Sequence, residues 1–151
     1  MSDIRVYADT SVFGGPFDEE FQTVSRTFFD QVRSGRFKLI TSALVQEEID
    51  PAPTPVRELF NELLRLVDVV EVSENALNLR AAYLETGIVT RQWADDALHV
   101  AIATVAGCSL IVSWNFKHIV HFEKIPLYNA VKHPEGLWNH RDIFAFGGYQ
   151  V

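Results

Sequence analysis

The chain has 151 residues, of which 48% are hydrophobic and 22% are charged, and its formal net charge is −7. This length suits one domain with a substantial core, and the negative charge argues against a large basic surface that binds nucleic acid through its phosphates alone. The single cysteine excludes an internal disulfide, and no apolar run reaches the length of a transmembrane helix or resembles an export signal. We therefore expect a soluble protein of the reducing cytoplasm, without membrane contact.

The N-terminal half predicts strands that alternate with helices. A short strand over residues 4–8 ends at Asp9, and Gly14-Gly15-Pro16 predicts a loop or tight turn. Apolar residues then recur at helical spacing from residue 18 until Gly35, and a second strand follows over 37–41. Ser42 is placed to cap a helix that the prolines at 51 and 53 end, and Thr54-Pro55 opens the next helix.

The C-terminal half continues this alternation. It predicts a strand over 67–72, a helix over 73–86, a helix over 92–106, a strand over 110–113, a turn at Trp114-Asn115 and a fifth strand near 125–128. This order implies a parallel sheet that helices cover on both faces. We assign residues 1–128 to this domain and residues 129–151 to a C-terminal extension of it, as a folded segment, an edge strand or a mobile arm.

The helix over 92–106 is the element around which the chain is organised. From residue 97 to residue 106 it is apolar nearly all the way round, which is typical of a helix packed on a sheet inside a protein. Asp95 and Asp96 stand at its start, where the helix dipole alone favours a carboxylate by about 0.3–1 kcal/mol. Neighbouring helix positions point about 100° apart, so the two side chains meet different surroundings. We expect Asp96, which shares a face with His99, to point at a shared site. We expect Asp95 to cap the helix or to support the residues of that site.

Acidic residues from distant segments should meet at one edge of the sheet. Right-handed crossovers bring helix N-termini to the carboxyl edge of a parallel sheet, where ligands bind. Asp9 ends the first strand, Asn115 follows the fourth, and Asp96 lies in the first turn of the helix before it. Glu48 lies within two turns of the start of its helix and can reach back, although adjacent Glu47 is an alternative.

Carboxylates held this close together raise one another's pKa. A hard divalent cation such as Mg²⁺ or Mn²⁺ relieves this repulsion, because it takes oxygen ligands, usually one or two carboxylates with waters and phosphate oxygens. Such an ion polarises a phosphoryl group, lowers the pKa of a bound water and stabilises charge on the leaving oxygen. The cluster therefore predicts metal-dependent hydrolysis of a phosphodiester.

Four segments also resemble, in the same order and spacing, the motifs of PIN-domain ribonucleases, notably the VapC-type toxins of bacterial toxin–antitoxin pairs. The segments are Asp9-Thr10-Ser11-Val12-Phe13, Glu48-Ile49, residues 96–103 and Leu110-Ile111-Val112-Ser113-Trp114-Asn115-Phe116. The resemblance covers residues 4–128. It implies a PIN-like three-layer α/β/α sandwich with a mostly parallel central sheet, and an endoribonuclease that depends on Mg²⁺ or Mn²⁺. It also implies a cognate antitoxin and a homodimer.

The resemblance implies roles for individual residues. Asp9, Glu48 and Asp96 would be the metal-binding acids, and Thr10 or Ser11 would assist near the metal. Asn115 would complete the catalytic set, but it departs from the pattern because many relatives carry a fourth acid there. Its amide oxygen can hold the metal or a metal-bound water without adding charge, which weakens the case for a second ion.

Basic and histidine side chains complete the list of candidates. Arg91 and Lys117 flank the predicted edge and are candidates for contacts to RNA phosphates, against the alternative of a solvated surface role. We expect His99 to be a hydrogen-bonded core histidine and not a ligand. His118 and His121 have a spacing that could suit a transition metal, but no cysteine lies nearby to support a zinc site.

Other functions fit the sequence less well. The second hypothesis is a PIN-like module with catalysis weakened at Asn115, which binds RNA or protein. A phosphoacceptor receiver domain needs an acidic pair after its first strand and a lysine after its last, and Asp9 alone does not provide the pair. Gly14-Gly15 lacks the residues of a nucleotide-binding loop. The apolar stripes of the helices near 21–32 and 59–66 should face the core, and any surplus exposed patch would mark an antitoxin or dimer groove.

Overall fold

The computed structural model describes residues 4–115, 119, 124–131 and 144–146. These residues form a five-stranded sheet with the order β3-β2-β1-β4-β5, in which all four pairings are parallel. The strands are β1 (Arg5–Ala8), β2 (Lys38–Ser42), β3 (Val67–Val70), β4 (Leu110–Val112) and β5 (Phe144–Phe146). The predicted parallel sheet is therefore confirmed, and β1 lies at its centre.

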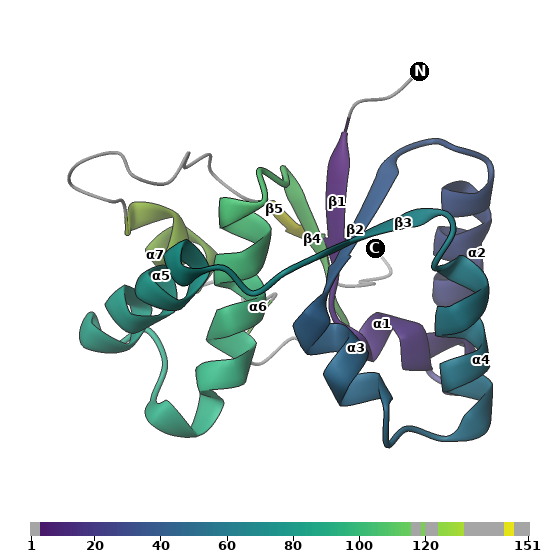
Figure 1. Cartoon of the computed structure of the whole chain (residues 1–151), viewed down its shortest axis with the longest axis horizontal. Helices are drawn as coiled ribbons and strands as arrows, with labels where there is room; N and C mark the ends of the chain where they lie inside the picture. Colours follow the sequence, from purple (N-terminus) through teal and green to yellow (C-terminus); the bar gives the residue numbers. More distant parts are fainter. Residues whose placement is uncertain (1–3, 116–118, 120–123, 132–143, 147–151) are drawn as a thin grey trace.

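Helices cover both sides of this sheet. The α-helices are α1 (Thr10–Gly14), α2 (Gln22–Arg33), α3 (Ala43–Ile49), α4 (Thr54–Leu63), α5 (Glu74–Glu85), α6 (Ala94–Val105) and α7 (Lys124–Ala130), and two short 3-10 helices are η1 (Gly15–Phe17) and η2 (Arg91–Trp93). In Figure 1 the sheet stands between α5, α6 and α7 on one side and α2 and α4 on the other. This arrangement is the predicted three-layer α/β/α sandwich. Among the described helices, none is both long enough and apolar enough to cross a bilayer.

Helix α6 is buried as its composition predicts. All eight residues from Ala97 to Thr104 are buried, and α6 packs beside α5. Each large aliphatic side chain buried in this way stabilises the fold by roughly 1.5–3 kcal/mol. The first turn, with Asp95 and Asp96, emerges from the core, so α6 anchors a polar end at the edge of the sheet.

The segment after β1 differs from its prediction. The loop or tight turn predicted at Gly14-Gly15-Pro16 is instead the end of α1 followed by η1. Pro16 fits because the first residues of a helix lack intrahelical acceptors for their N–H groups. Gly15 fits because a Cβ there would lie 1.9 Å from Ser25 Oγ and 2.6 Å from Trp114 Nε1. The glycine is therefore needed for close packing in a helix and not for a reversal of the chain.

The fifth strand was also misplaced. The strand predicted near 125–128 is helix α7, whose Pro126 lies in the first turn, where a missing N–H costs little. The fifth strand is β5, which pairs in parallel with β4 from Leu110 to Val112. Of the three possibilities for the tail, an edge strand is thus present at residues 144–146.

The strand order places a topological switch point beside β1. From β1 the chain moves to β2 and β3 on one side, and then returns to β4 and β5 on the other. Ligands of open α/β sheets bind at the carboxyl end of the strands where the order reverses. Here this position lies between the ends of β1 and β4, which are followed by Asp9 and by Ser113.

Candidate functional site

Asp9 is a buried carboxylate at the switch point, with a side chain that is fixed on both oxygens. The residue is only 4% exposed. Ser11 Oγ donates to Oδ1 at 2.6 Å, and Ser113 Oγ donates to Oδ2 at 2.8 Å. Burial raises the pKa of Asp9, and although the charge of His99 and the two hydroxyls lower it in part, the net pKa stays above its ordinary value. The hydrogen bonds and the charge of His99 thus compensate only in part for the burial of the charged form of Asp9.

The end of β4 is tied to Asp9 through the same hydroxyls. The backbone N–H of Trp114 donates to Ser11 Oγ at 2.9 Å, and that of Asn115 donates to Ser113 Oγ at 2.9 Å. Asn115 is therefore placed beside the Asp9 network through its main chain. Ser113 was not among the predicted site residues, although its position directly after the fourth strand was the available signal.

Glu48 reaches the same region from α3. Its side chain is 32% exposed, and its Oε1 accepts a hydrogen bond from Thr10 Oγ1 at 2.5 Å. The same oxygen lies 2.9 Å from Nε2 of His99. Adjacent Glu47 is exposed, so α3 turns Glu48, and not Glu47, toward the site. Burial raises the pKa of Glu48, but the hydrogen bond and charge of His99, together with Thr10, outweigh burial and lower the pKa.

His99 is buried at the meeting point of α6, α3 and β1. It is 3% exposed, and its Nδ1 lies 2.7 Å from the hydroxyl of Tyr7, which is itself 2.9 Å from Ser42 Oγ. The expectation of a hydrogen-bonded core histidine is therefore correct. Burial lowers the pKa of His99, but the hydrogen bond to Glu48 and the charges of Asp9, Glu48 and Asp96 outweigh burial and raise it.

Asp96 takes part in this group through its charge. It is partly buried in the first turn of α6 and raises the pKa of His99, as Asp9 and Glu48 do. The three predicted acids are therefore all within electrostatic reach of one imidazole. Asp95 has a different environment: it is exposed and lies 3.9 Å from Arg80 in an ion pair.

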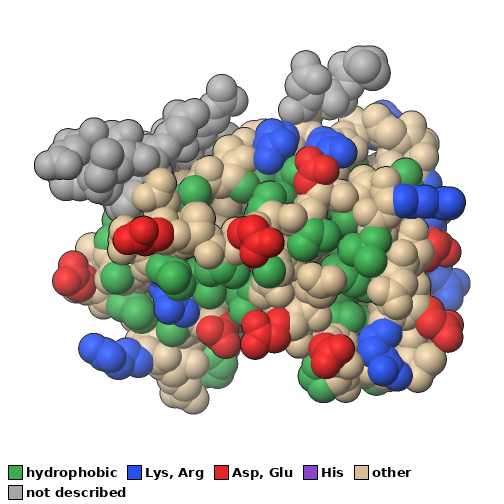
Figure 2. Space-filling model, viewed as in Figure 1, with side chains coloured by type: hydrophobic (Ala, Val, Ile, Leu, Met, Phe, Trp, Pro, Cys, Tyr) green, Lys and Arg blue, Asp and Glu red, His purple; other side chains and the backbone are tan. Residues whose placement is uncertain are grey.

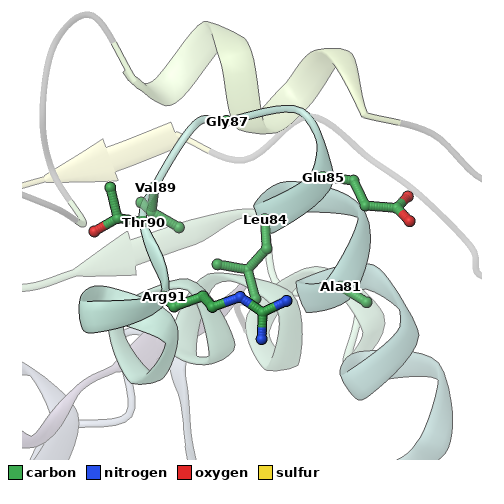
Figure 3. A pocket seen from close by; sticks show the side chains of 7 residues that line it. All are labelled: Ala81, Leu84, Glu85, Gly87, Val89, Thr90 and Arg91. Carbon is green, nitrogen blue, oxygen red and sulfur yellow. The ribbon is translucent and has the colours of Figure 1, made fainter.

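Arg91 occupies a separate position. It lines a pocket of about 600 Å³ between the end of α5 and η2, and Figure 3 shows its side chain passing beside Leu84. Among described residues, the pocket lining includes none of Asp9, Glu48, Asp96 and Asn115. The predictions at Lys117, His118 and His121 lie outside the described residues.

The charged surface agrees with the composition. On the face drawn in Figure 2, lysine and arginine side chains of the described residues are interspersed with aspartate and glutamate. No continuous basic patch is visible on this face, as the net charge of −7 leads one to expect. Any contact with a nucleic acid here would depend on individual basic side chains and not on a broad positive surface.

The residues fit a hard divalent cation in chemistry. The carboxylates of the site offer the oxygen ligands that such an ion takes, and Asp9 is a buried carboxylate with a raised pKa, which a nearby cation would lower. Within the described part of the chain, no three histidine, cysteine, aspartate or glutamate side chains are close enough to form a metal site by themselves. Mg²⁺ does not need three, because it is commonly held by one or two carboxylates with waters and substrate phosphates.

Comparison with known proteins identifies the fold. No protein-family model matches the sequence, and no curated protein matches it. The structure matches a chain in VapBC2 from Rickettsia felis bound to a promoter DNA fragment, with a TM-score of 0.61 and 10% identity over 97% of this chain and 100% of that chain. It matches a chain in FitAB bound to an IR36 DNA fragment with a TM-score of 0.63 and 13% identity, over 97% and 96% of the two chains.

A third solved structure has a similar fold. A chain in FitAcB from Neisseria gonorrhoeae matches with a TM-score of 0.54 and 14% identity, over 76% of this chain and 91% of that chain. At sequence identities of 10–14%, these matches show that the fold is shared. The resemblance to VapC-type PIN domains that the sequence motifs indicate is confirmed at that level.

Proposed function

We propose that this protein is a metal-dependent endoribonuclease that acts in the cytoplasm as the toxin of a toxin–antitoxin pair. The observation that carries the proposal is the group at the switch point, where Asp9, Glu48 and Asp96 share the electrostatic surroundings of His99. The group occupies the position where α/β sheets bind ligands, in a fold that VapBC2 and FitAB structures share. Its acids and amide are the donors that Mg²⁺ or Mn²⁺ takes.

In this proposal the metal is held within the group of Asp9, Asp96 and Glu48, by one or two of their carboxylates with waters and substrate phosphates, and Asn115 supports it with an uncharged oxygen. When bound, Mg²⁺ or Mn²⁺ would polarise the scissile phosphate and lower the pKa of a bound water. The chain holds its acids in place through hydroxyls: Ser11 and Ser113 fix the two oxygens of Asp9. The hydroxyl of Thr10 likewise holds Glu48 in place, by donating to one carboxylate oxygen, Oε1.

Arg91 and Lys117 remain our candidates for contacts to the RNA backbone. A phosphate contact adds affinity that falls as salt rises, and it adds little sequence discrimination. Replacing Arg91 with Ala should therefore raise the KM for RNA and weaken the salt dependence of binding, with kcat changed less. An unchanged KM would remove Arg91 from the substrate site and leave it with the surface role.

The test of the activity compares two neighbouring acids on α6. Purified protein is assayed on varied RNAs with Mg²⁺ or Mn²⁺, with and without chelator. Asp96→Asn should abolish cleavage while the melting temperature stays near that of the wild type, because a ligand is neutralised without loss of a core side chain. Asp95→Asn is the matched control: this exposed residue contacts Arg80 at the surface, so cleavage should be unchanged.

Two results would contradict this function. Cleavage by Asp96→Asn at the wild-type rate would remove Asp96 from the metal site. Wild-type protein that shows no chelator-sensitive cleavage of any RNA would favour the second hypothesis, a PIN-like module that binds RNA or protein without cutting it. A binding assay with the same RNAs would then separate an RNA-binding module from a protein-binding one.

The proposed antitoxin needs an apolar surface to bind. A pocket of about 340 Å³ lies among η1, α2 and α4, lined in part by Phe17, Phe29 and Leu59. Phe17 is 50% exposed there, so an apolar side chain beside the pocket is available for a protein contact. The pocket also contains Arg26, Arg33 and Asp30, and Arg33 already pairs with Asp30 and Glu62. We therefore propose that a mainly apolar antitoxin segment binds the pocket, with an acidic side chain toward Arg26.

Partner binding can be tested separately from cleavage. If a cognate antitoxin is encoded next to this gene, the wild-type pair should copurify and Phe17→Ser should weaken copurification without loss of metal-dependent cleavage. If Phe17→Ser copurifies with the antitoxin as well as the wild type does, the antitoxin binds at a surface other than this pocket. The predicted homodimer is checked by light scattering of the chain alone, and a monomer mass at all concentrations would exclude it.

A further inference from the structure

We propose that His99 is a positioning residue that orients the Glu48 carboxylate for metal binding through a hydrogen-bond relay anchored on Tyr7 and Ser42. This inference rests on the proposed function and adds to it a residue that the motif resemblance did not place in the metal site. The juxtaposition that carries it is a buried imidazole between two fixed partners, with 2.7 Å from Nδ1 to Tyr7 and 2.9 Å from Nε2 to Glu48.

The relay joins elements that are far apart in the sequence. Its anchor is Ser42, which caps α3 by accepting from the N–H of Val45 at 3.3 Å and also lies 2.9 Å from the Tyr7 hydroxyl. Ser42, Tyr7 and His99 are all nearly inaccessible to solvent. The relay thus extends from β2 through β1 and α6 to Glu48 on α3, and the partly exposed carboxylate is its outer end.

The proton positions in this relay have a single consequence at Glu48. If the imidazole is neutral, Tyr7 donates to Nδ1 and Nε2 carries the hydrogen. If it is charged, Nδ1 donates to Tyr7 and Nε2 again carries a hydrogen. An ionised carboxylate is an acceptor only, so Nε2 donates to Glu48 in both cases. The relay therefore delivers one fixed donor to Oε1, whichever form His99 takes.

This donor restricts a side chain that otherwise has several rotamers. Oε1 also accepts from Thr10, so the carboxylate is held at one oxygen from two directions. Residues that orient a metal-binding side chain by hydrogen bonds affect metal affinity about 10–100-fold when they are changed. The competing explanation is a satisfied core histidine, which would affect stability and leave metal affinity unaltered.

Two amide substitutions separate these explanations. In His99→Gln the amide nitrogen can take the place of Nε2 and donate to Glu48, whereas in His99→Asn the shorter side chain places its amide near Nδ1 and cannot reach. Both variants lose the ring and its packing, so both should lower the melting temperature. Affinity for Mn²⁺ is measured on the full chain by electron paramagnetic resonance, with circular dichroism to confirm folding.

We expect His99→Asn to bind Mn²⁺ about 10–100-fold more weakly than the wild type, and His99→Gln to stay within a few-fold of it. Equal affinity in all three proteins would overturn the positioning role, as would equal losses in the Gln and Asn variants. Wild-type protein that binds no Mn²⁺ would overturn the proposed function, and the positioning role with it. Binding by the wild type and both variants alike overturns the positioning role alone.

A second variant applies if His99→Asn does not fold. Tyr7→Phe keeps the aromatic packing and removes only the hydroxyl that holds Nδ1. With the ring less constrained, Mn²⁺ affinity should fall several-fold. The double variant of Glu48→Gln with Tyr7→Phe should bind Mn²⁺ no more weakly than Glu48→Gln alone. Full Mn²⁺ affinity in Tyr7→Phe would overturn the relay.

Discussion

Gly15 is the position where one added methyl group should do the most damage. A Cβ there would lie 1.9 Å from Ser25 Oγ, 2.9 Å from Ser25 Cβ and 2.6 Å from Trp114 Nε1. The serine hydroxyl can rotate away, but its Cβ and the indole ring cannot. The fold must therefore move α2 or the Trp114 ring, which is 7% exposed and stacked on Phe21 with centroids 5.4 Å apart.

The magnitude for Gly15→Ala follows from two costs. Overpacking a buried site costs about 1–3 kcal/mol. Separating Ser25 from Trp114 breaks their 3.0 Å buried hydrogen bond, and a buried polar group left without a partner costs about 1–3 kcal/mol. We expect the free energy of unfolding to fall by about 2–6 kcal/mol and the melting temperature to fall by roughly 5–20 °C.

Gly14→Ala is the matched control. No atom lies within 4 Å of a Cβ at Gly14, and its φ of −80° and ψ of −17° suit alanine. Replacing a glycine at a compatible position stabilises a protein by about 0.4–1 kcal/mol. Both variants are unfolded by heat and by urea and followed by circular dichroism. Equal stability of the two variants would refute the packing argument at Gly15.

Three further predictions concern hydroxyls and the thiol. Ser113→Ala removes a hydrogen-bond donor that lowers the pKa of Asp9, and the pKa of Asp9 should therefore rise in this variant. Mn²⁺ titrations at neutral pH should then show a weaker affinity. An unchanged affinity would show that this hydroxyl does not support the site. Ser42→Ala and Ser73→Ala each remove a helix cap, and each should lower the free energy of unfolding in urea by about 0.5–2 kcal/mol. Only Ser42→Ala should also weaken Mn²⁺ binding. An equal loss of Mn²⁺ affinity in Ser73→Ala would argue against the relay. Burial raises the pKa of Cys108 to about 12, so the thiol should resist iodoacetamide until the protein is unfolded, and rapid labelling of the native chain would contradict its 1% exposure.

Local rules predicted much of this fold because the relevant signals lie within one turn or one strand. The cap at Ser42 is a hydroxyl three residues before the N–H that it accepts, so the sequence contains both partners. The burial of α6 follows from a run of apolar residues without a polar face. The position of Asp9 after a central strand follows from the rule that strands alternating with helices form parallel sheets.

The errors lie where local signals are short. The residues at 125–128 are Ile, Pro, Leu and Tyr, and four apolar residues suit a buried strand and a helix turn equally well. Helix α7 and strand β5 are only seven and three residues long, and β5 is defined by its pairing with β4 more than by its own sequence. At Gly15, the sequence indicated a turn because glycine and proline are turn residues, whereas the actual constraint comes from Ser25 and Trp114.

The partners of His99 could not be read from the sequence. Glu48 is 51 positions away and Tyr7 is 92 positions away, so both contacts depend on how α6 packs against β1 and α3. A usable signal was nevertheless present. A polar side chain on a wholly buried helix needs a hydrogen-bond partner, and the same helix carries Asp96 at the edge where acids were expected to gather.

The His99 environment changes the electrostatic account of the site. Repulsion among the acids was expected to require a divalent cation, but the structure already supplies an imidazole whose pKa the charges of Asp9, Glu48 and Asp96 raise. This compensation is uneven, because the pKa of Glu48 is lowered while that of Asp9 stays raised. The remaining electrostatic cost is therefore concentrated at Asp9, and that is where a bound cation would stabilise the fold most. It follows that saturating Mn²⁺ should raise the melting temperature of the wild type and should have little effect on Asp9→Asn.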